Sequence, residues 1–153
     1  MQAKPVIQWT CKSFDELTTP ELYALLQLRS AVFVVEQNSI YQDVDGKDLK
    51  SHHLIAAENG TVVAYTRLLP PGMSYPDQSI GRVVVARSHR AYGLGFELMQ
   101  RSISASYLLF GNNPIRISAQ LYLKRFYESL AFQQVSDIYD EDGIPHIEML
   151  KNP

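Results

Sequence analysis

The stretch 80–100 constrains the fold more than any other part of this chain. It begins as a β-branched apolar run, Val83-Val84-Val85, and ends with leucine and methionine at helical spacing. Between these two patterns lie Arg90 and the glycines Gly93 and Gly95. This order predicts a strand that leads through a glycine-containing turn directly into the start of a helix.

The predicted helix start is the first candidate binding site. The first N–H groups of a helix have no intrahelical acceptor, and together with the helix dipole they attract phosphate oxygens. Glycines let phosphates reach the backbone because no Cβ intervenes, and an arginine adds a forked cationic donor. We therefore predict a pyrophosphate site formed by Arg90 and the residues that follow it: Ala91, Tyr92, Gly93, Leu94, Gly95 and Phe96. The alternative is that the two glycines serve only a tight turn and close packing.

Other nucleotide motifs are missing from the sequence. It contains no Gly-x-x-x-x-Gly-Lys-Ser/Thr, and no Gly-x-Gly-x-x-Gly opens its first strand–helix unit. A kinase-like or dinucleotide-binding protein is therefore a poor interpretation.

Composition limits the class of protein. A chain of 153 residues with 46% hydrophobic content is long enough for one globular domain with its own core, which we place at residues 1–153. A net charge of −2 without a basic stripe argues against nucleic acid as a partner. The only cysteine, Cys11, cannot form an internal disulfide, which fits a reducing compartment. No apolar run is long enough to span a bilayer and no signal-peptide pattern is seen, so we expect a cytoplasmic protein without a membrane partner.

The remaining patterns predict an α/β (α+β) fold. Thr18 or Thr19 opens the first helix, and Asn59-Gly60 is a strong hairpin signal. The expected elements are strands at 6–10, 53–58, 61–69, 80–85, 115–119, 132–135 and 144–150, helices from 19 to about 33, from 94 to about 109 and over 121–130, and a turn at 140–143. This order indicates a largely antiparallel sheet flanked by helices, with a parallel strand pair around the central helix.

An acidic segment follows the first predicted helix. It carries Asp43, Asp45 and Asp48, and Asp-x-Asp-Gly is similar to the start of a calcium loop. The spacing to a bidentate glutamate is absent, so no metal is predicted. Two interpretations stay open: a solvated loop, or an acidic rim that attracts a cationic substrate. Arg29 falls on the apolar face of the preceding helix and should either snorkel or form an ion pair.

Two motifs in the expected order resemble a known family. Val83-Val84-Val85 followed by Arg90-Ala91-Tyr92-Gly93-Leu94-Gly95 resembles the acetyl-CoA motif of the GNAT acyltransferase superfamily, Arg/Gln-x-x-Gly-x-Gly/Ala, with Ala91 where many members have glycine. Phe126-Tyr127 through Ala131-Phe132 resembles the family's Phe-Tyr-x-x-x-Gly-Phe, with Ala131 in the glycine position. The segments 28–37, 81–83, 119–120 and 139–146 are similar to the ElaA-type branch, so the resemblance extends almost to the C-terminus.

The resemblance implies the GNAT fold, with a splayed parallel strand pair at the cofactor site, and acetyl-CoA as cosubstrate without a metal. The pantetheine arm would pair with backbone groups of Val83 and Val85, and an N–H near Val84 or Val85 would polarise the thioester carbonyl. A primary amine, on a small molecule or a peptide, would then attack directly within a ternary complex. The acceptor is not specified by the resemblance.

The resemblance also suggests catalytic residues. Tyr127 falls on the family's tyrosine, which protonates the departing CoA thiolate; packing is its alternative role. For deprotonation of the amine, Glu36 is the first candidate base, and a surface glutamate is the alternative. Asp142 and His146 are candidate substrate-side residues, and Arg82 either binds an acidic substrate group or pairs with a carboxylate. A non-catalytic acyl-CoA-binding regulator is the alternative function, and exposed edge strands are compatible with a homodimer.

Overall fold

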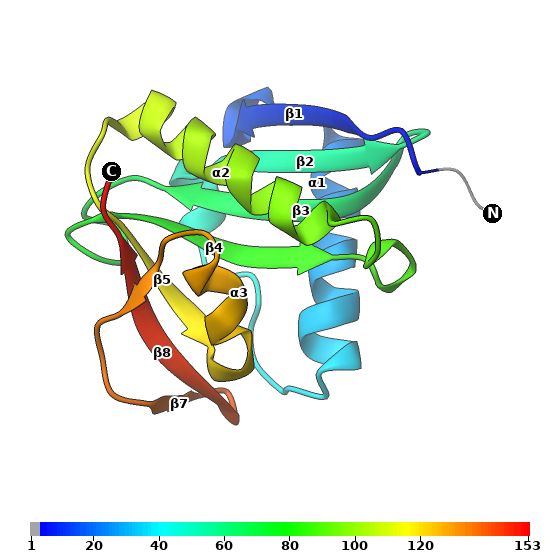
Figure 1. Cartoon of the computed structure of the whole chain (residues 1–153). Helices are drawn as coiled ribbons and strands as arrows, with labels where there is room; N and C mark the ends of the chain where they lie inside the picture. Colours follow the sequence, from blue (N-terminus) through cyan, green and yellow to red (C-terminus); the bar gives the residue numbers. More distant parts are fainter. Residues whose placement is uncertain (1–3) are drawn as a thin grey trace.

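The computed structural model describes residues 4–153, which form one eight-stranded sheet with helices on both faces (Figure 1). The strand order is β1-β2-β3-β4-β5-β8-β6, with β7 paired to β8. The strands are β1 (Gln8–Ser13), β2 (His52–Glu58), β3 (Thr61–Leu69), β4 (Gln78–Val85), β5 (Ile115–Gln120), β6 (Gln133–Gln134), β7 (Tyr139–Glu141) and β8 (Ile144–Lys151). The longer helices are α1 (Thr19–Arg29), the π-helix η2 (Ser30–Glu36), α2 (Leu94–Phe110) and α3 (Lys124–Glu128), and short 3₁₀ turns cover Phe14–Glu16, Lys47–Lys50, Arg87–His89 and Leu121–Leu123.

The sheet has the predicted mixed character. Among the paired strands of residues 4–153, β4 and β5 are parallel and the other pairs are antiparallel. A parallel pair needs a crossover, and α2 supplies it between β4 and β5. The predicted architecture is therefore confirmed, including the parallel pair around the central helix.

The core lies on both faces of the sheet. Leu25 of α1 and Val32 of η2 pack on one face against Ile55, Tyr65 and Val84. The other face is covered by α2 and α3, as Figure 1 shows. The buried residues there include Leu54, Ala64, Leu94, Leu98, Met99, Ile103, Ile115, Ile117, Phe132, Ile147 and Met149.

The two long helices begin differently. Thr18 caps α1, because its hydroxyl accepts the Glu21 N–H at 3.2 Å and Glu21 accepts the Thr18 N–H at 2.8 Å. Of the two predicted cap residues, the structure therefore has Thr18. At the start of α2, Gly93 is the N-cap, and no side chain caps the helix. The Leu94 N–H donates to the Ala91 carbonyl at 3.3 Å, and the following N–H groups of Gly95 and Phe96 are open to an external acceptor.

Several predicted boundaries are wrong. The first strand covers Gln8–Ser13 rather than 6–10, and the strand expected at 132–135 is reduced to Gln133–Gln134. Tyr139–Glu141, which overlaps the turn predicted at 140–143, forms β7 and pairs with β8. The turn itself is only Asp142-Gly143, both at positive φ, which matches a two-residue type I′ hairpin. Short strands that carry charged residues lack the alternation of apolar and polar side chains by which a strand is identified in a sequence.

Two further properties concern possible partners. Within residues 4–153, none of the helices is long and apolar enough to cross a membrane. The same residues contain no group of three or more histidine, cysteine, aspartate or glutamate side chains placed to hold a metal ion.

Candidate active site

Strands β4 and β5 separate after a short paired segment. Only Gln78 and Ser79 of β4 pair with β5, opposite Ile115 and Arg116. Beyond them β5 pairs with β8 on its other side, and β4 pairs with β3 on its other side. The edge of β4 from residue 80 to 85 is therefore free toward β5. A free strand edge of this kind can accept an extended ligand through its backbone groups.

A β-bulge lies in the free part of β4. Tyr65 pairs with Val84 and Arg67 pairs with Gly81, so one residue of β3 faces two residues of β4. Arg82, one of these two, has a left-handed backbone with φ of 48°. The bulge interrupts the regular pairing of β4 next to the point where the two strands diverge.

The start of α2 lies directly beyond the end of β4. Tyr92 and Gly93 have left-handed backbones, with φ of 60° and 69°. The Glu97 N–H donates to the Gly93 carbonyl at 3.1 Å, so the N–H groups of Gly95 and Phe96 precede the first regular helix bond. A Cβ added at Gly95 would lie 3.9 Å from Val85 and 3.9 Å from Phe126, which shows how closely this turn approaches β4 and α3. The predicted strand–glycine–helix element is confirmed, and Ala91 lies outside the left-handed region.

The Arg90 side chain, which lies at this helix start, is engaged in hydrogen bonds. Its guanidinium donates to both carboxylate oxygens of Glu36, at 2.6 and 2.9 Å, and its Nε donates to the Val85 carbonyl at 3.0 Å. The hydrogen bond from Arg90 lowers the pKa of Glu36. A carboxylate with a lowered pKa is a weaker base. The role of Glu36 as general base stays a prediction, and this pairing weighs against it.

Tyr127 lies in α3, on the other wall of the site. It is 5% exposed and packs edge-on against Phe126 and Phe132, with ring centroids 5.1 and 5.9 Å apart. Burial raises the pKa of Tyr127, so the phenol keeps its proton at neutral pH.

Ala131 lies just beyond the C-terminal end of α3, the short helix that carries Tyr127. The Phe132 N–H donates to the Tyr127 carbonyl at 3.1 Å, and Ala131 has a φ of 72°. This is the C-terminal arrangement in which glycine is strongly favoured. The structure thus explains the glycine of the family motif, and alanine bears a backbone strain at this position.

One cavity of about 570 Å³ connects these elements. This volume lies within the usual range for small-molecule sites. The cavity is lined by both diverging strands, the start of α2, and α3. Of the predicted site residues, its lining includes Glu36, Val83, Val84, Val85, Arg90, Gly93, Leu94, Gly95, Phe96 and Tyr127, whereas Ala91 and Tyr92 lie outside it.

The cavity also has a polar wall that the sequence revealed only in part. Glu141, Asp142 and His146 of the β7–β8 hairpin line it, together with Ser118 of β5. His146 is 6% exposed, and its Nε2 lies 3.1 Å from Glu141 Oε2. Ser118 lies in none of the segments that resemble the family, and Glu141 lies in one but is not among the predicted site residues. Their positions on paired strands bring them together. Asp142 and His146, both candidates from the sequence, do lie at the site.

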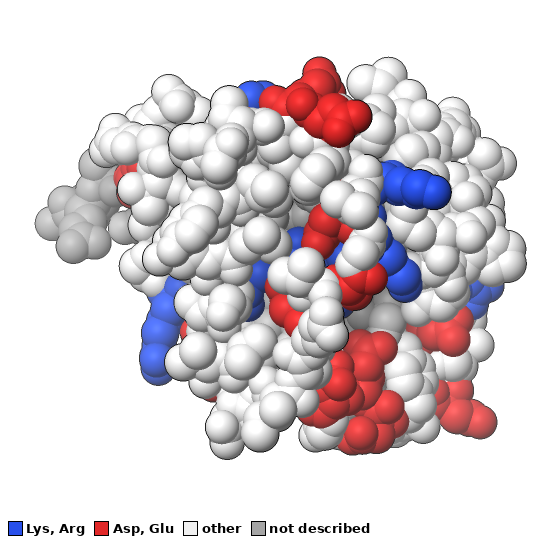
Figure 2. Space-filling model, turned by 180° about the vertical axis from the view of Figure 1, so that it is seen from behind, with Lys and Arg blue, Asp and Glu red and all other residues white. Residues whose placement is uncertain are grey.

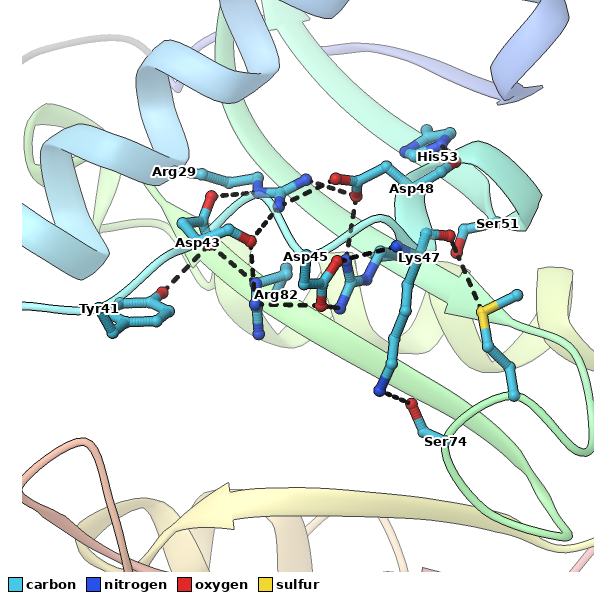
Figure 3. A network of polar contacts seen from close by, with 12 residues as sticks. Arg29, Tyr41, Asp43, Asp45, Lys47, Asp48, Ser51, His53, Ser74 and Arg82 are labelled. Carbon is cyan, nitrogen blue, oxygen red and sulfur yellow. Dashed lines mark hydrogen bonds and ion pairs between the residues drawn. The ribbon is translucent and has the colours of Figure 1, made fainter.

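The acidic segment forms a buried ion-pair network rather than a solvated loop (Figure 3). Arg29 is fully buried and contacts Asp43 at 2.8 Å and Asp48 at 2.7 Å. Arg67 contacts Asp45 at 2.8 Å and Asp48 at 3.0 Å. The prediction of a solvated loop is wrong for Asp43 and Asp48, because both carboxylates are buried against arginines that lie far from them in sequence. The predicted pairing of Arg29 is confirmed.

Arg82 belongs to the same network and also lines the cavity. Its Nε lies 2.8 Å from Asp43 Oδ1, and its Nη2 lies 3.3 Å from Asp45 Oδ2. Of the two roles predicted for Arg82, the structure shows the pairing with carboxylates. The three aspartates and three arginines balance in charge, so this segment provides no acidic rim for a cationic substrate.

Comparison with known proteins identifies the family. A family model described as an acetyltransferase (GNAT) domain matches residues 21–153. The chain belongs to the GNAT acetyltransferase family. Protein ElaA of Escherichia coli (strain K12) is 41% identical over 148 residues, which cover 95% of this chain and 97% of ElaA.

Solved structures support the family assignment. The crystal structure of Escherichia coli ElaA matches with a TM-score of 0.90 at 40% identity and covers 96% of this chain and 100% of ElaA. An acyl-CoA N-acyltransferase from Pseudomonas aeruginosa matches with a TM-score of 0.91 at 47% identity, over 95% of this chain and 99% of that chain. The GNAT fold and the resemblance to the ElaA-type branch are thereby confirmed.

Proposed function

We propose that this GNAT protein is an N-acyltransferase that moves the acetyl group of acetyl-CoA to a primary amine, on a small molecule or a peptide, by direct attack in a ternary complex. The observation that carries the proposal is the divergence of β4 and β5, which leaves the edge of β4 free inside one cavity. The uncapped start of α2 and the buried Tyr127 line the same cavity. The similarity to an acyl-CoA N-acyltransferase supports the same reaction class.

Each end of the cavity has a role in this proposal. The N–H groups at the start of α2 hold the diphosphate of the carrier, with Arg90 beside them. The free edge of β4 pairs with the pantetheine arm through Val83 and Val85. A backbone N–H near Val84 or Val85 then polarises the thioester carbonyl, a contribution of about 3 kcal/mol for oxyanion donors of this type.

Tyr127 completes the proton transfers of the reaction. The amine nitrogen attacks the thioester carbon, the carbon–sulfur bond breaks, and the leaving thiolate takes the proton of the Tyr127 phenol. Because burial raises the pKa of Tyr127, the resulting phenolate is a strong base. It recovers a proton at once from the positively charged nitrogen of the new amide. The products are the acetylated amine and free CoA, and Tyr127 returns to its starting state.

The replacement Tyr127→Phe tests this proposal. It removes the hydroxyl and keeps the buried ring, so we expect thiol release from acetyl-CoA to fall about 100-fold, with little change in CoA affinity measured by calorimetry. Tyr23→Phe is the matched control, because Tyr23 is exposed on α1 and lies outside the cavity lining. Unchanged turnover in Tyr127→Phe would remove Tyr127 from the mechanism. Tight CoA binding by the wild-type protein without thiol release, across a wide panel of amines, would instead favour an acyl-CoA-binding regulator.

A further inference from the structure

The polar wall of the cavity contains a connected group of side chains from three strands. Glu141 of β7 contacts His146 of β8 at 3.1 Å and accepts from the Ser118 hydroxyl of β5 at 3.4 Å. Ser118 Oγ lies 2.5 Å from the Tyr139 hydroxyl, and the Tyr139 ring stacks on His146 with centroids 6.1 Å apart. The Glu141 carboxylate is the centre of this group. It is also half-exposed, so it can exchange protons with solvent.

The geometry of His146 defines a place for one proton. Its Nδ1 lies 2.7 Å from the Ile144 carbonyl oxygen, which can only accept, so Nδ1 carries a hydrogen. In a neutral imidazole Nε2 would then be a bare acceptor facing the Glu141 carboxylate. The 3.1 Å separation of Nε2 and Oε2 is an ion-pair contact, which becomes attractive when His146 takes up a second proton. The Glu141–His146 pair is therefore placed to take up one proton.

We propose that Glu141 and His146 form the proton acceptor for the amine, and that the amine enters this end of the cavity as an ammonium ion. This inference rests on the proposed function and adds the base that Glu36 does not readily provide. A primary amine with a pKa of about 10 arrives protonated and must lose one proton before it attacks. The carboxylate and the neutral imidazole take that proton and adopt the observed contact, and the exposed Glu141 then releases it to solvent.

The charges around this pair favour a cationic ligand. Asp142 adds a second carboxylate to the cavity lining, and the neighbouring Asp140 is also exposed. Figure 2 shows acidic side chains gathered on the lower part of the molecule seen from behind, the end at which β7 and β8 lie in Figure 1. Across the cavity Arg82 is already matched by Asp43 and Asp45.

The other titratable groups facing the pair do not supply an opposing charge. Tyr75 and Tyr139 stay protonated because burial raises the pKa of each phenol. Glu148 of β8 is engaged by Arg116 of β5 at 3.0 Å, and Arg116 also pairs with Asp77. The local charge therefore remains negative even when His146 is protonated.

Histidine NMR tests ligand binding without requiring turnover. The chain has four histidines, and the imidazole resonance lost in His146→Gln identifies His146. We expect putrescine, titrated into the protein with CoA present, to shift this resonance, and γ-aminobutyrate, a similar chain ending in a carboxylate, to bind about fivefold more weakly. Asp137→Asn is the control, because Asp137 is exposed near the hairpin but does not line the cavity. An unmoved His146 resonance, or equal affinity for the two probes, would overturn the inference.

Thiol release tests the catalytic role separately. Glu141→Gln and His146→Gln should lower the maximal rate about 100-fold, while Asp137→Asn keeps the wild-type rate. Because His146 is buried and its replacement can disturb folding, the half-exposed Glu141 is the deciding position. A Glu141→Gln rate within about twofold of wild type would refute the proton-acceptor role. A His146 resonance that responds to putrescine in a protein without any thiol release would support the amine site and refute the acyltransferase function.

Discussion

Replacing Asp48 with asparagine tests the buried network most sharply. The Asp48 carboxylate is 5% exposed and lies 2.7 Å from Arg29 Nη1 and 3.0 Å from Arg67 Nη1. Asparagine has nearly the same shape but no charge, and its amide group places two hydrogens near the guanidinium groups. The network of three arginines and three aspartates would change from balanced to a net charge of about +1.

The expected loss of folding free energy follows from the burial of the Asp48 carboxylate. Removing one partner of a buried ion pair typically costs about 3–5 kcal/mol, because the remaining charge stays buried without compensation. In a chain of this size each kcal/mol lowers Tm by about 2–4 °C. We therefore expect Asp48→Asn to lower Tm by roughly 6–20 °C.

Urea and thermal unfolding provide the assay. The matched control is Asp77→Asn, because Asp77 pairs with Arg116 at 2.9 Å but both side chains are about one quarter exposed. Partly exposed pairs contribute at most about 1 kcal/mol. If Asp48→Asn loses no more folding stability than Asp77→Asn, the assignment of the network as a buried stabilising element is refuted.

The pH dependence of the same variant tests the direction of the Asp48 pKa shift. Burial alone would raise the pKa of Asp48, but hydrogen bonds from Arg29 outweigh it and lower the pKa. The stabilisation by the carboxylate is therefore complete above its unfolded pKa of about 3.9 and is lost as pH falls through the folded value. The stability difference between wild type and Asp48→Asn should be full at neutral pH and shrink below about pH 4. A difference that grows on acidification would contradict this account.

Two further replacements have definite expected outcomes. Ala131→Gly should stabilise the protein by about 1 kcal/mol in urea unfolding, because glycine relieves the left-handed strain at φ of 72°; a loss of stability would contradict the assigned helix end. Glu36→Gln should tighten acetyl-CoA binding about threefold by calorimetry, since it releases Arg90 from a partly exposed pair, and should leave the maximal rate within about twofold. Weaker binding would instead show that Glu36 holds Arg90 in its working position.

Local patterns in the sequence predicted the part of the site that contiguous residues build. The strand–glycine–helix element at 80–100 depends on short-range signals, and the structure has it. The position of Tyr127 was implied by the family resemblance, and Tyr127 lines the cavity. The hairpin at Asn59-Gly60 follows for the same reason, since both residues have positive φ. The divergence of β4 and β5 was expected from the family resemblance, because no local pattern encodes where two strands separate.

Local sequence patterns could not predict contacts between residues that lie far apart in the chain. Asp43 and Asp48 look like loop residues because such carboxylates are usually exposed, and only the fold brings Arg29, Arg67 and Arg82 to them. The same limit applies to the polar wall, where Ser118 and Glu141 meet through the pairing of β5, β8 and β7. The partner of Arg90 could not be read from sequence either, because Glu36 lies on a different element.

A crystal structure with acetyl-CoA bound tests the central claim most directly. The account predicts the pantetheine arm along the free edge of β4, its diphosphate oxygens accepting from the N–H groups of Gly95 and Phe96, and the thioester sulfur beside the Tyr127 hydroxyl. A carrier bound elsewhere on the protein, or a β4 edge that closes onto β5 and excludes the arm, would contradict it.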